Sequence, residues 1–290
     1  MLAAGAGPGA CRAVSSPEET SLTSQAEVKM KKSGHADPRY QKGLEVGQRL
    51  GGDAFSAVVG KLEEVDDELA NYLVGGAYGA IMARPQLSLE DSELVIISCL
   101  AVQGYLPQLE WHIAAALRIG VPPEAVREVL VQVIPYAGWP AALNALGAMK
   151  KVFAERQISL EHLPKTPASR PERSALNLTG RERGGAVYAD YADVERTLAE
   201  YDPELPGYLT ENSYGQIYAR PGLDMRRREL IAVAMLTAQQ RLPQLGWHIE
   251  GAHRVGGTPI ETKEVIITML LYVGWPAALN ALEVWKQKSK

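Results

Sequence analysis

The chain has 290 residues, 46% of them hydrophobic and 22% charged, which is enough to bury the core of one large or two small domains. Its 30 basic and 34 acidic residues give a net charge of −4, so nothing in the composition favours nucleic acid or an anionic membrane as a partner. Two cysteines, Cys11 and Cys99, exclude a disulfide framework, a structural zinc site and a Cys-x-x-Cys redox pair. We expect a cytoplasmic globular protein.

Residues 1–37 form a tail rich in Ala, Gly and Ser that we expect to be disordered. The tail lacks the basic start and continuous apolar core of a secretory signal peptide, and an organellar transit role stays open. Two later stretches, 129–146 and 265–282, approach membrane-spanning length. Because Pro135 interrupts the first and Gly274 and Pro276 interrupt the second, we expect buried helices instead.

The first predicted helix covers 66–83, where apolar residues recur at helical spacing. It stops at Arg84-Pro85, because the residue before a proline avoids the α-helical region. The second begins at its N-cap Ser88 and runs to about residue 103. Asp91 takes the place of the usual Glu or Gln of a capping box.

A third helix begins with Pro107 in its first turn, carries His112 and ends at Gly120. A fourth begins near Pro123. The run Gly138-Trp139-Pro140 then breaks the chain, and a last helix follows. Nothing alternates with period two for long enough to form a sheet, so the sequence predicts an all-α fold.

The same elements recur 136 residues later, which indicates a duplicated domain. The pattern Leu-Pro-Gln-Leu-x-Trp-His-Ile occurs at 106–113 and at 242–249. Gly-Trp-Pro-Ala-Ala-Leu-Asn-Ala-Leu occurs at 138–146 and at 274–282. We therefore divide the chain into the tail, a first repeat over 38–160, a linker rich in Pro and charge over 161–184, and a second repeat over 185–290.

Glu93 and His112, which recur as Glu229 and His248, are the main candidates for proton-transfer chemistry. Glu93 lies among apolar residues of a predicted helix, where an unpaired carboxylate is desolvated and its pKa raised. Such a glutamate is either a general acid or base, or the buried structural partner of another group. The histidine equally is either catalytic or structural, since duplication by itself also preserves packing residues.

Candidate substrate-binding residues flank each histidine. One turn before the histidine lies Gln108 in the first repeat and Gln244 in the second, and six residues after it lies Arg118 or Arg254. Trp139 and Trp275 lie at the chain breaks. The arginines either bind a substrate carboxylate or interact with the C-terminal helix dipole. The tryptophans, with Tyr136 and Tyr272, either line an apolar pocket or belong to the core.

Three further features have simple interpretations. We expect Arg226-Arg227-Arg228 to form a solvated face and Cys99 to be a small buried hydrophobe. No metal site is expected, because His248 and His253 are five residues apart and Leu117 takes the place of His253 in the first repeat.

The chain resembles the carboxymuconolactone decarboxylase family, which includes the alkyl hydroperoxidase D-like proteins, over nearly all residues from 39 onward except the linker. Both repeats carry Tyr-x-Gly-x-Pro-Ala-Ala, at 136–142 and 272–278. The decarboxylase branch is indicated by Arg39-Tyr40, Gly43-Leu44-Glu45-Val46, Gly52-Asp53-Ala54, Arg220-Pro221-Gly222-Leu223-Asp224 and the run ending at Arg241. The resemblance implies two tandem alkyl hydroperoxidase D-like helical domains.

The hydroperoxidase branch uses a glutamate, a histidine and the two thiols of a Cys-x-x-Cys. At the thiol positions this chain has Tyr105 with Gln108 and Arg241 with Gln244. Without a thiolate nucleophile, we expect no thiol-dependent peroxide reduction. The chain also departs from the decarboxylase branch, which usually has an acidic residue where Gln108 and Gln244 lie.

The resemblance therefore implies a cofactor-independent lyase of aromatic-compound catabolism that acts on a small anionic lactone or unsaturated cyclic acid. The histidines would protonate or polarise the substrate, the glutamates would orient them, and the arginines would hold an anionic group. The alternatives are a non-catalytic member, an isomerase or another oxidoreductase. Since single-domain decarboxylases of the family form rings of six, the tandem chain is expected to form a homotrimer. The repeats need not be equally active, because Glu110 becomes Gly246 between them.

Overall fold

The computed structural model describes residues 37–163 and 171–289. The predicted tail, apart from its last residue, and residues 164–170 of the predicted linker lie outside these ranges. Within them every regular element is helical and no strand occurs, so the predicted all-α fold with two tandem copies is confirmed.

The two repeats have the same order of elements. The first contains α2 (Pro38–Gly51), α3 (Asp53–Glu63), α4 (Asp67–Asn71), η1 (Tyr72–Met82), α5 (Leu89–Gln103), α6 (Leu106–Arg118) and α7 (Pro123–Glu155). The second contains α8 (Arg173–Val187), α9 (Tyr191–Tyr201), α10 (Leu205–Gly207), η3 (Tyr208–Tyr218), α11 (Met225–Gln239), α12 (Leu242–Arg254) and α13 (Pro259–Lys288). The short η2 (Leu160–His162) follows the first repeat, and η1 and η3 are π-helices.

The caps and breaks that the sequence predicted are mostly confirmed. Ser88 caps α5 by accepting a hydrogen bond from the backbone N–H of Asp91 at 3.0 Å. Helices α7 and α13 begin at Pro123 and Pro259, and each bends where a glycine has a non-helical conformation, Gly138 or Gly274. The capping-box role of Asp91 is wrong, because its carboxylate instead binds arginines of the second repeat.

The second repeat begins earlier than the sequence suggested. Residues 173–184, which we expected to belong to the linker, lie in α8, and α8 packs against η3 as α2 packs against η1. Small residues allow this packing, since a Cβ on Gly180 would lie 2.0 Å from the carbonyl oxygen of Thr210. The Pro and charge content of the segment concealed a helix that tertiary contact stabilises.

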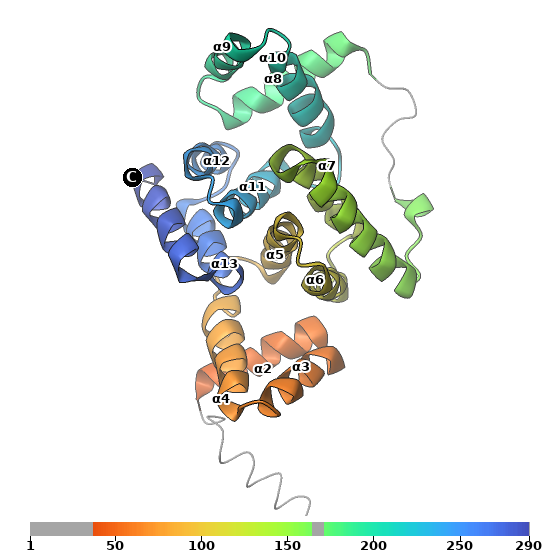
Figure 1. Ribbon diagram of the computed structural model, residues 1–290, viewed down its shortest axis with the longest axis vertical. Helices are drawn as coiled ribbons and strands as arrows, with labels where there is room; N and C mark the ends of the chain where they lie inside the picture. Colours follow the sequence, from red (N-terminus) through yellow and green to blue (C-terminus); the bar gives the residue numbers. More distant parts are fainter. Residues whose placement is uncertain (1–36, 164–170, 290) are drawn as a thin grey trace, which may run out of the picture.

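One hydrophobic core joins the repeats. Helices α5 and α11 pack against each other at the centre of the molecule, while α2 to α4 and α8 to α10 lie at opposite ends (Figure 1). Every residue of α5 from Asp91 to Ala101 is buried, and the main cluster of buried apolar side chains draws on both repeats. The two copies therefore form a single folded unit.

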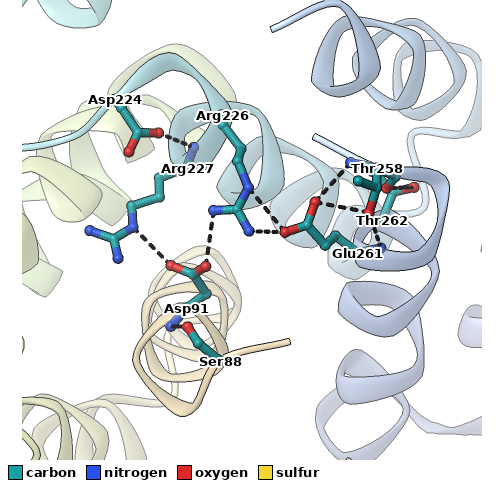
Figure 2. Close-up of polar contacts among 8 residues, drawn as sticks. All are labelled: Ser88, Asp91, Asp224, Arg226, Arg227, Thr258, Glu261 and Thr262. Atoms are coloured by element: carbon teal, nitrogen blue, oxygen red, sulfur yellow. Dashed lines mark hydrogen bonds and ion pairs between the residues drawn. The ribbon is translucent and has the colours of Figure 1, made fainter. Parts of the chain in front are cut away.

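Ion pairs between the repeats lie close to this core. Arg84 binds Glu264 and, at the equivalent positions of the other repeat, Arg220 binds Glu128 at 2.7 Å. Asp91 accepts hydrogen bonds from both Arg226 and Arg227, as Figure 2 shows. These pairs connect helix ends that are far apart in the sequence.

The interpretation of Arg226-Arg227-Arg228 as a solvated face is wrong. Arg226 and Arg227 pair with Asp91 across the boundary between the repeats, and the Arg228 side chain is 0% exposed. Arg228 lies within 3.5 Å of the Glu128 carboxylate and donates to the Gln132 side chain at 3.2 Å. Charge in a helix is no guide to exposure when a partner carboxylate comes from another element.

Helices α7 and α13 are long and apolar enough to cross a membrane by length and composition alone. The glycine bend divides each of them. Both helices have buried residues before and after the bend, and exposed apolar residues such as Trp139 and Trp275 directly after it. The expectation of buried helices is therefore confirmed only in part, because each helix buries one side along its length and leaves the other partly exposed.

Candidate active site

The first candidate site is built around His112 on α6. Its Nδ1 lies 2.9 Å from Oε2 of Glu93 on α5, and both side chains are buried. Its Nε2 lies 3.2 Å from the hydroxyl of Tyr272, which belongs to α13 of the other repeat. The Trp111 ring contacts the imidazole edge-on, with ring centroids 4.8 Å apart.

The second candidate site repeats this arrangement around His248 on α12. Its Nδ1 lies 2.8 Å from Oε2 of Glu229 on α11, and both side chains are buried. Its Nε2 lies 3.4 Å from the hydroxyl of Tyr136 on α7 and 3.5 Å from that of Tyr188. Each repeat thus supplies the phenol that faces the histidine of the other.

The local fold explains this exchange of tyrosines. Gly138 and Gly274 have φ of 79° and 77° with ψ of 173° and 171°, a conformation essentially confined to glycine. Tyr136 and Tyr272 lie two residues before these bends, at the end of segments that pack on the central helices. The helix interruption that the sequence indicated therefore carries one residue of each site.

The hydrogen bonds assign roles to the two imidazole nitrogens. A carboxylate can only accept, so Nδ1 of each histidine carries the proton and Nε2 has a lone pair that faces the phenol. The other carboxylate oxygen, Oε1, of both Glu93 and Glu229 is buried without a hydrogen-bond partner. Each histidine is thus held by its glutamate with Nε2 directed at the neighbouring phenol.

The phenols near the histidines stay protonated at neutral pH. Burial, followed by the charge of Glu229, holds the pKa of Tyr136 well above 10. Burial, followed by the charge of Glu93, does the same to the pKa of Tyr272. Both hydroxyls are therefore hydrogen-bond donors over the physiological range, suited to an imidazole lone pair or to negative charge that develops on a substrate.

A cavity of about 230 Å³ opens onto His248. Its lining is mostly aromatic and apolar, with a few polar groups, as in small-molecule sites. The residues that line it are Pro135, Tyr136, Tyr188, Leu209, Ser213, Tyr214, Tyr218, Leu236, Gln239, Arg241, Gln244 and His248. The volume corresponds to about seven or eight water molecules, which limits the ligand to a small molecule.

Of the predicted substrate-binding glutamines and arginines, only Gln244 lines the cavity at His248. Gln108 is exposed near the start of α6. Arg118 and Arg254 are exposed at the ends of α6 and α12, outside the cavity that contains His248. The Arg118 guanidinium lies over Gly52, where an added Cβ would be 2.6 Å from Nη2.

The two tryptophans are exposed, Trp139 at 61% and Trp275 at 66%, so their interpretation as core residues is wrong. Trp139 lines a different hollow, together with Ile217 and Pro221 of the second repeat. Cys99, by contrast, is fully buried, as the sequence predicted. In the described part of the chain no group of three or more His, Cys, Asp or Glu side chains is placed so that it could hold a metal ion.

Sequence reasoning missed Tyr188, Tyr214 and Tyr218, and did not assign Arg241 to the cavity. The Tyr214 hydroxyl donates to that of Tyr188 at 3.1 Å, and the hydroxyls of Tyr218 and Tyr136 are 2.5 Å apart. The only available signal was the density of tyrosines over 188–218. Their approach to His248 depends on how α8 and η3 pack.

The comparison with known proteins agrees with this architecture. The chain matches the model of the carboxymuconolactone decarboxylase family over residues 52–151 and 203–287. These segments make up more than half of the chain and fall in the two repeats. The chain therefore belongs to the carboxymuconolactone decarboxylase family, as a tandem member.

Individual relatives are more distant. The chain is 28% identical to 4-carboxymuconolactone decarboxylase of Acinetobacter baylyi over 130 residues, which cover 44% of this chain and 97% of that protein. It is 33% identical to nitrosuccinic acid decarboxylase of Metarhizium robertsii over 94 residues, covering 31% and 66% respectively. An uncharacterised 15.0 kDa protein of Paracoccus denitrificans is 33% identical over 91 residues, covering 31% and 68%. These relatives support a decarboxylase-like function.

Proposed function

We propose that the protein is a cofactor-independent carboxy-lyase that removes CO₂ from a small, unsaturated or otherwise activated carboxylic acid. The observation that carries the proposal is the arrangement of buried glutamate, histidine and tyrosine, with an aromatic cavity in front of His248. Decarboxylation needs a site that weakens the solvation of the carboxylate, stabilises the electron pair left behind and supplies a proton.

These groups can serve each step. The bond between the carboxyl carbon and its neighbour breaks, CO₂ leaves, and the electron pair moves into an adjacent carbonyl or similar acceptor. The phenols donate hydrogen bonds to the negative charge that forms there. The histidine, held by its glutamate, takes up a proton from solvent and passes it to the carbon that has lost CO₂. One carboxylate and one proton thus give CO₂ and a product that is one carbon shorter.

The partner is accordingly a small-molecule carboxylate. The relatives suggest two compounds for a first test, 4-carboxymuconolactone and nitrosuccinic acid. Each would be incubated with the wild-type protein, with His248→Gln and with Glu229→Gln, and CO₂ release would be followed. General acid–base groups contribute about 10²–10⁴-fold to a rate, so we expect losses of this size in kcat for at least one compound.

The control is Arg196→Gln, a change on the surface of α9, which is expected to leave the rate of CO₂ release unchanged. Release of CO₂ that survives His248→Gln and the corresponding His112→Gln together would contradict the acid–base role of the histidines. No release from either compound by folded wild-type protein would contradict these compounds as substrates and favour a non-catalytic or differently specialised member.

A further inference from the structure

The two candidate sites differ at positions that the duplication relates. Subtracting 136 from the numbers of Tyr188, Tyr218 and Arg241 gives Gly52, Met82 and Tyr105. All three residues of the second repeat line the cavity at His248. The sites share their glutamate, histidine and exchanged tyrosine, and differ in the groups that would hold a ligand.

Tyr188 and Tyr218 extend the hydrogen-bonding surface of the second site. The Tyr188 hydroxyl lies 3.5 Å from Nε2 of His248 and accepts from Tyr214. Tyr218 bonds to Tyr136 through their hydroxyls, and the Arg228 guanidinium lies over its ring, 5.8 Å from the centroid.

Arg241 provides a positive charge in the lining of the cavity. Its backbone caps α12, and Arg241, Gln244 and His248 follow one face of that helix at i, i+3 and i+7. Its side chain is exposed, and within residues 37–163 and 171–289 no hydrogen bond or ion pair engages its guanidinium. A guanidinium free of protein carboxylates can form a bidentate pair with a ligand carboxylate.

The first site lacks these groups. Gly52 has no side chain, and the Arg118 guanidinium covers it where a tyrosine would begin. Met82 has no hydroxyl to bind Tyr272, and Tyr105, which is 52% exposed, carries no charge in place of Arg241. Trp111 packs directly on His112, whereas the equivalent Trp247 packs on Tyr188 at 6.5 Å between ring centroids.

We propose that the second site alone binds the anionic substrate, with Arg241 pairing with a carboxylate and the tyrosines of the cavity facing the reacting end. The His112–Glu93 pair of the first site then has a structural role. The inference that an anion binds at the second site depends on the cavity and on Arg241. The assignment of turnover to His248 rests on the proposed function. The distance along the helix from Arg241 to His248, about 10 Å, suits a small acid that contacts both.

The test is a titration of histidine-labelled protein with itaconate, a small unsaturated dicarboxylate that serves as a stable probe. NMR signals of the histidine rings would be assigned with His112→Gln and His248→Gln. We expect itaconate to shift the His248 signals in a saturable way and to leave those of His112 in place. Dimethyl itaconate, which has no charge, is expected to shift neither.

Arg241→Gln is expected to raise the dissociation constant for itaconate at least tenfold, and Arg196→Gln to change it less than twofold. Because Arg241 is exposed, the variant is expected to fold, which circular dichroism would check. Equal shifts at His112 and His248, or unchanged affinity in Arg241→Gln, would overturn the proposal. If itaconate binds as expected while no acid is decarboxylated, the proposed function fails and the binding site remains.

Discussion

Among single residues, Cys99 is a case in which burial determines the reactivity of a side chain. It lies on α5 with its side chain fully buried, close to the first candidate site, and the side-chain amide of Gln103 donates to its sulfur at 3.1 Å. Burial raises the pKa of the thiol to about 12, although the hydrogen bond from Gln103 acts in the opposite direction. Almost no thiolate exists at neutral pH, so Cys99 cannot replace the missing Cys-x-x-Cys.

A thiol titration checks this conclusion. In a Cys11→Ser variant, where Cys99 is the single cysteine, we expect no reaction with a chromogenic aromatic disulfide over minutes at pH 7.5. The full amount is expected to react once denaturant exposes the side chain. Rapid stoichiometric reaction of the native variant would show that Cys99 is accessible and would contradict the conclusion that its thiol is unreactive.

At the scale of elements, the bends in α7 and α13 connect backbone conformation to the sites. Gly138 combines a φ of 79° with a ψ of 173°. An alanine there would be strained by about 1–3 kcal/mol, whatever space surrounds it. Because Tyr136 lies two residues before the bend, the strain is also expected to displace the phenol that faces His248.

Gly138→Ala should therefore lower the free energy of unfolding by about 1–3 kcal/mol, measured by chemical denaturation. Gly147→Ala is the matched control, since Gly147 is exposed in the regular helix after the bend and a Cβ there meets nothing within 4 Å. This control should be neutral or stabilising by up to about 1 kcal/mol. Equal effects of the two changes would be inconsistent with a special role for the bend.

The start of α13 is stabilised by a capping box that the sequence analysis did not identify. The Glu261 carboxylate accepts from the backbone and hydroxyl of Thr258 and pairs with Arg226, which also reaches Asp91 (Figure 2). Burial by itself would raise the pKa of Glu261, but the hydrogen bonds from Arg226 and Thr258 hold it below its ordinary value. The charged form is thus favoured in the folded state.

Glu261→Gln is expected to cost about 1–2 kcal/mol of unfolding free energy at pH 7. Since the folded-state pKa is lowered, the wild-type advantage is present above the unfolded value and is lost as the pH falls through the folded value. The difference between wild type and variant should begin to shrink near pH 5 and continue downward. Glu283→Gln, which removes an exposed carboxylate from the same helix, should be nearly neutral at every pH.

At the scale of the whole molecule, the apolar surface after each bend has no covering element in the described chain. Trp139 and Leu143 on α7, one turn apart, are 61% and 59% exposed, and the equivalent Trp275 and Leu279 on α13 are 66% and 54% exposed. Paired aromatic and aliphatic side chains on both repeats suit burial between subunits. We propose that they contribute to the interface of a homotrimer with six similar domains.

Native mass spectrometry tests this proposal. The wild-type protein should have three times the 31.5 kDa mass of one chain, and the double variant Trp139→Glu with Trp275→Glu should dissociate while keeping its helical circular dichroism. Leu178→Glu, at a residue that is 74% exposed on α8, is the control and should stay trimeric. A wild-type protein of 31.5 kDa would contradict the proposal.

The helices and the duplication could be inferred from neighbouring residues, and so could the two histidine–glutamate pairs as candidate sites. Helix starts at Ser88, Pro123 and Pro259 and the breaks at Gly138 and Gly274 are local backbone effects, so they can be read from neighbouring residues. The duplication is visible because the same local signals recur after 136 residues. The glutamate that each histidine contacts lies on the preceding helix of the same repeat, whereas Tyr188, which also faces His248, could not be found from the sequence.

Which groups meet across the repeats depends on how the helices pack, and the sequence did not reveal it. Tyr136 faces His248, 112 residues away, and Tyr272 faces His112, 160 residues away, and no periodicity encodes such contacts. Arg228 is buried although its run of three arginines suggested a surface, because Glu128 of the other repeat compensates its charge. Burial and charge pairing depend on distances between elements, so the sites became complete only when the two repeats packed around α5 and α11.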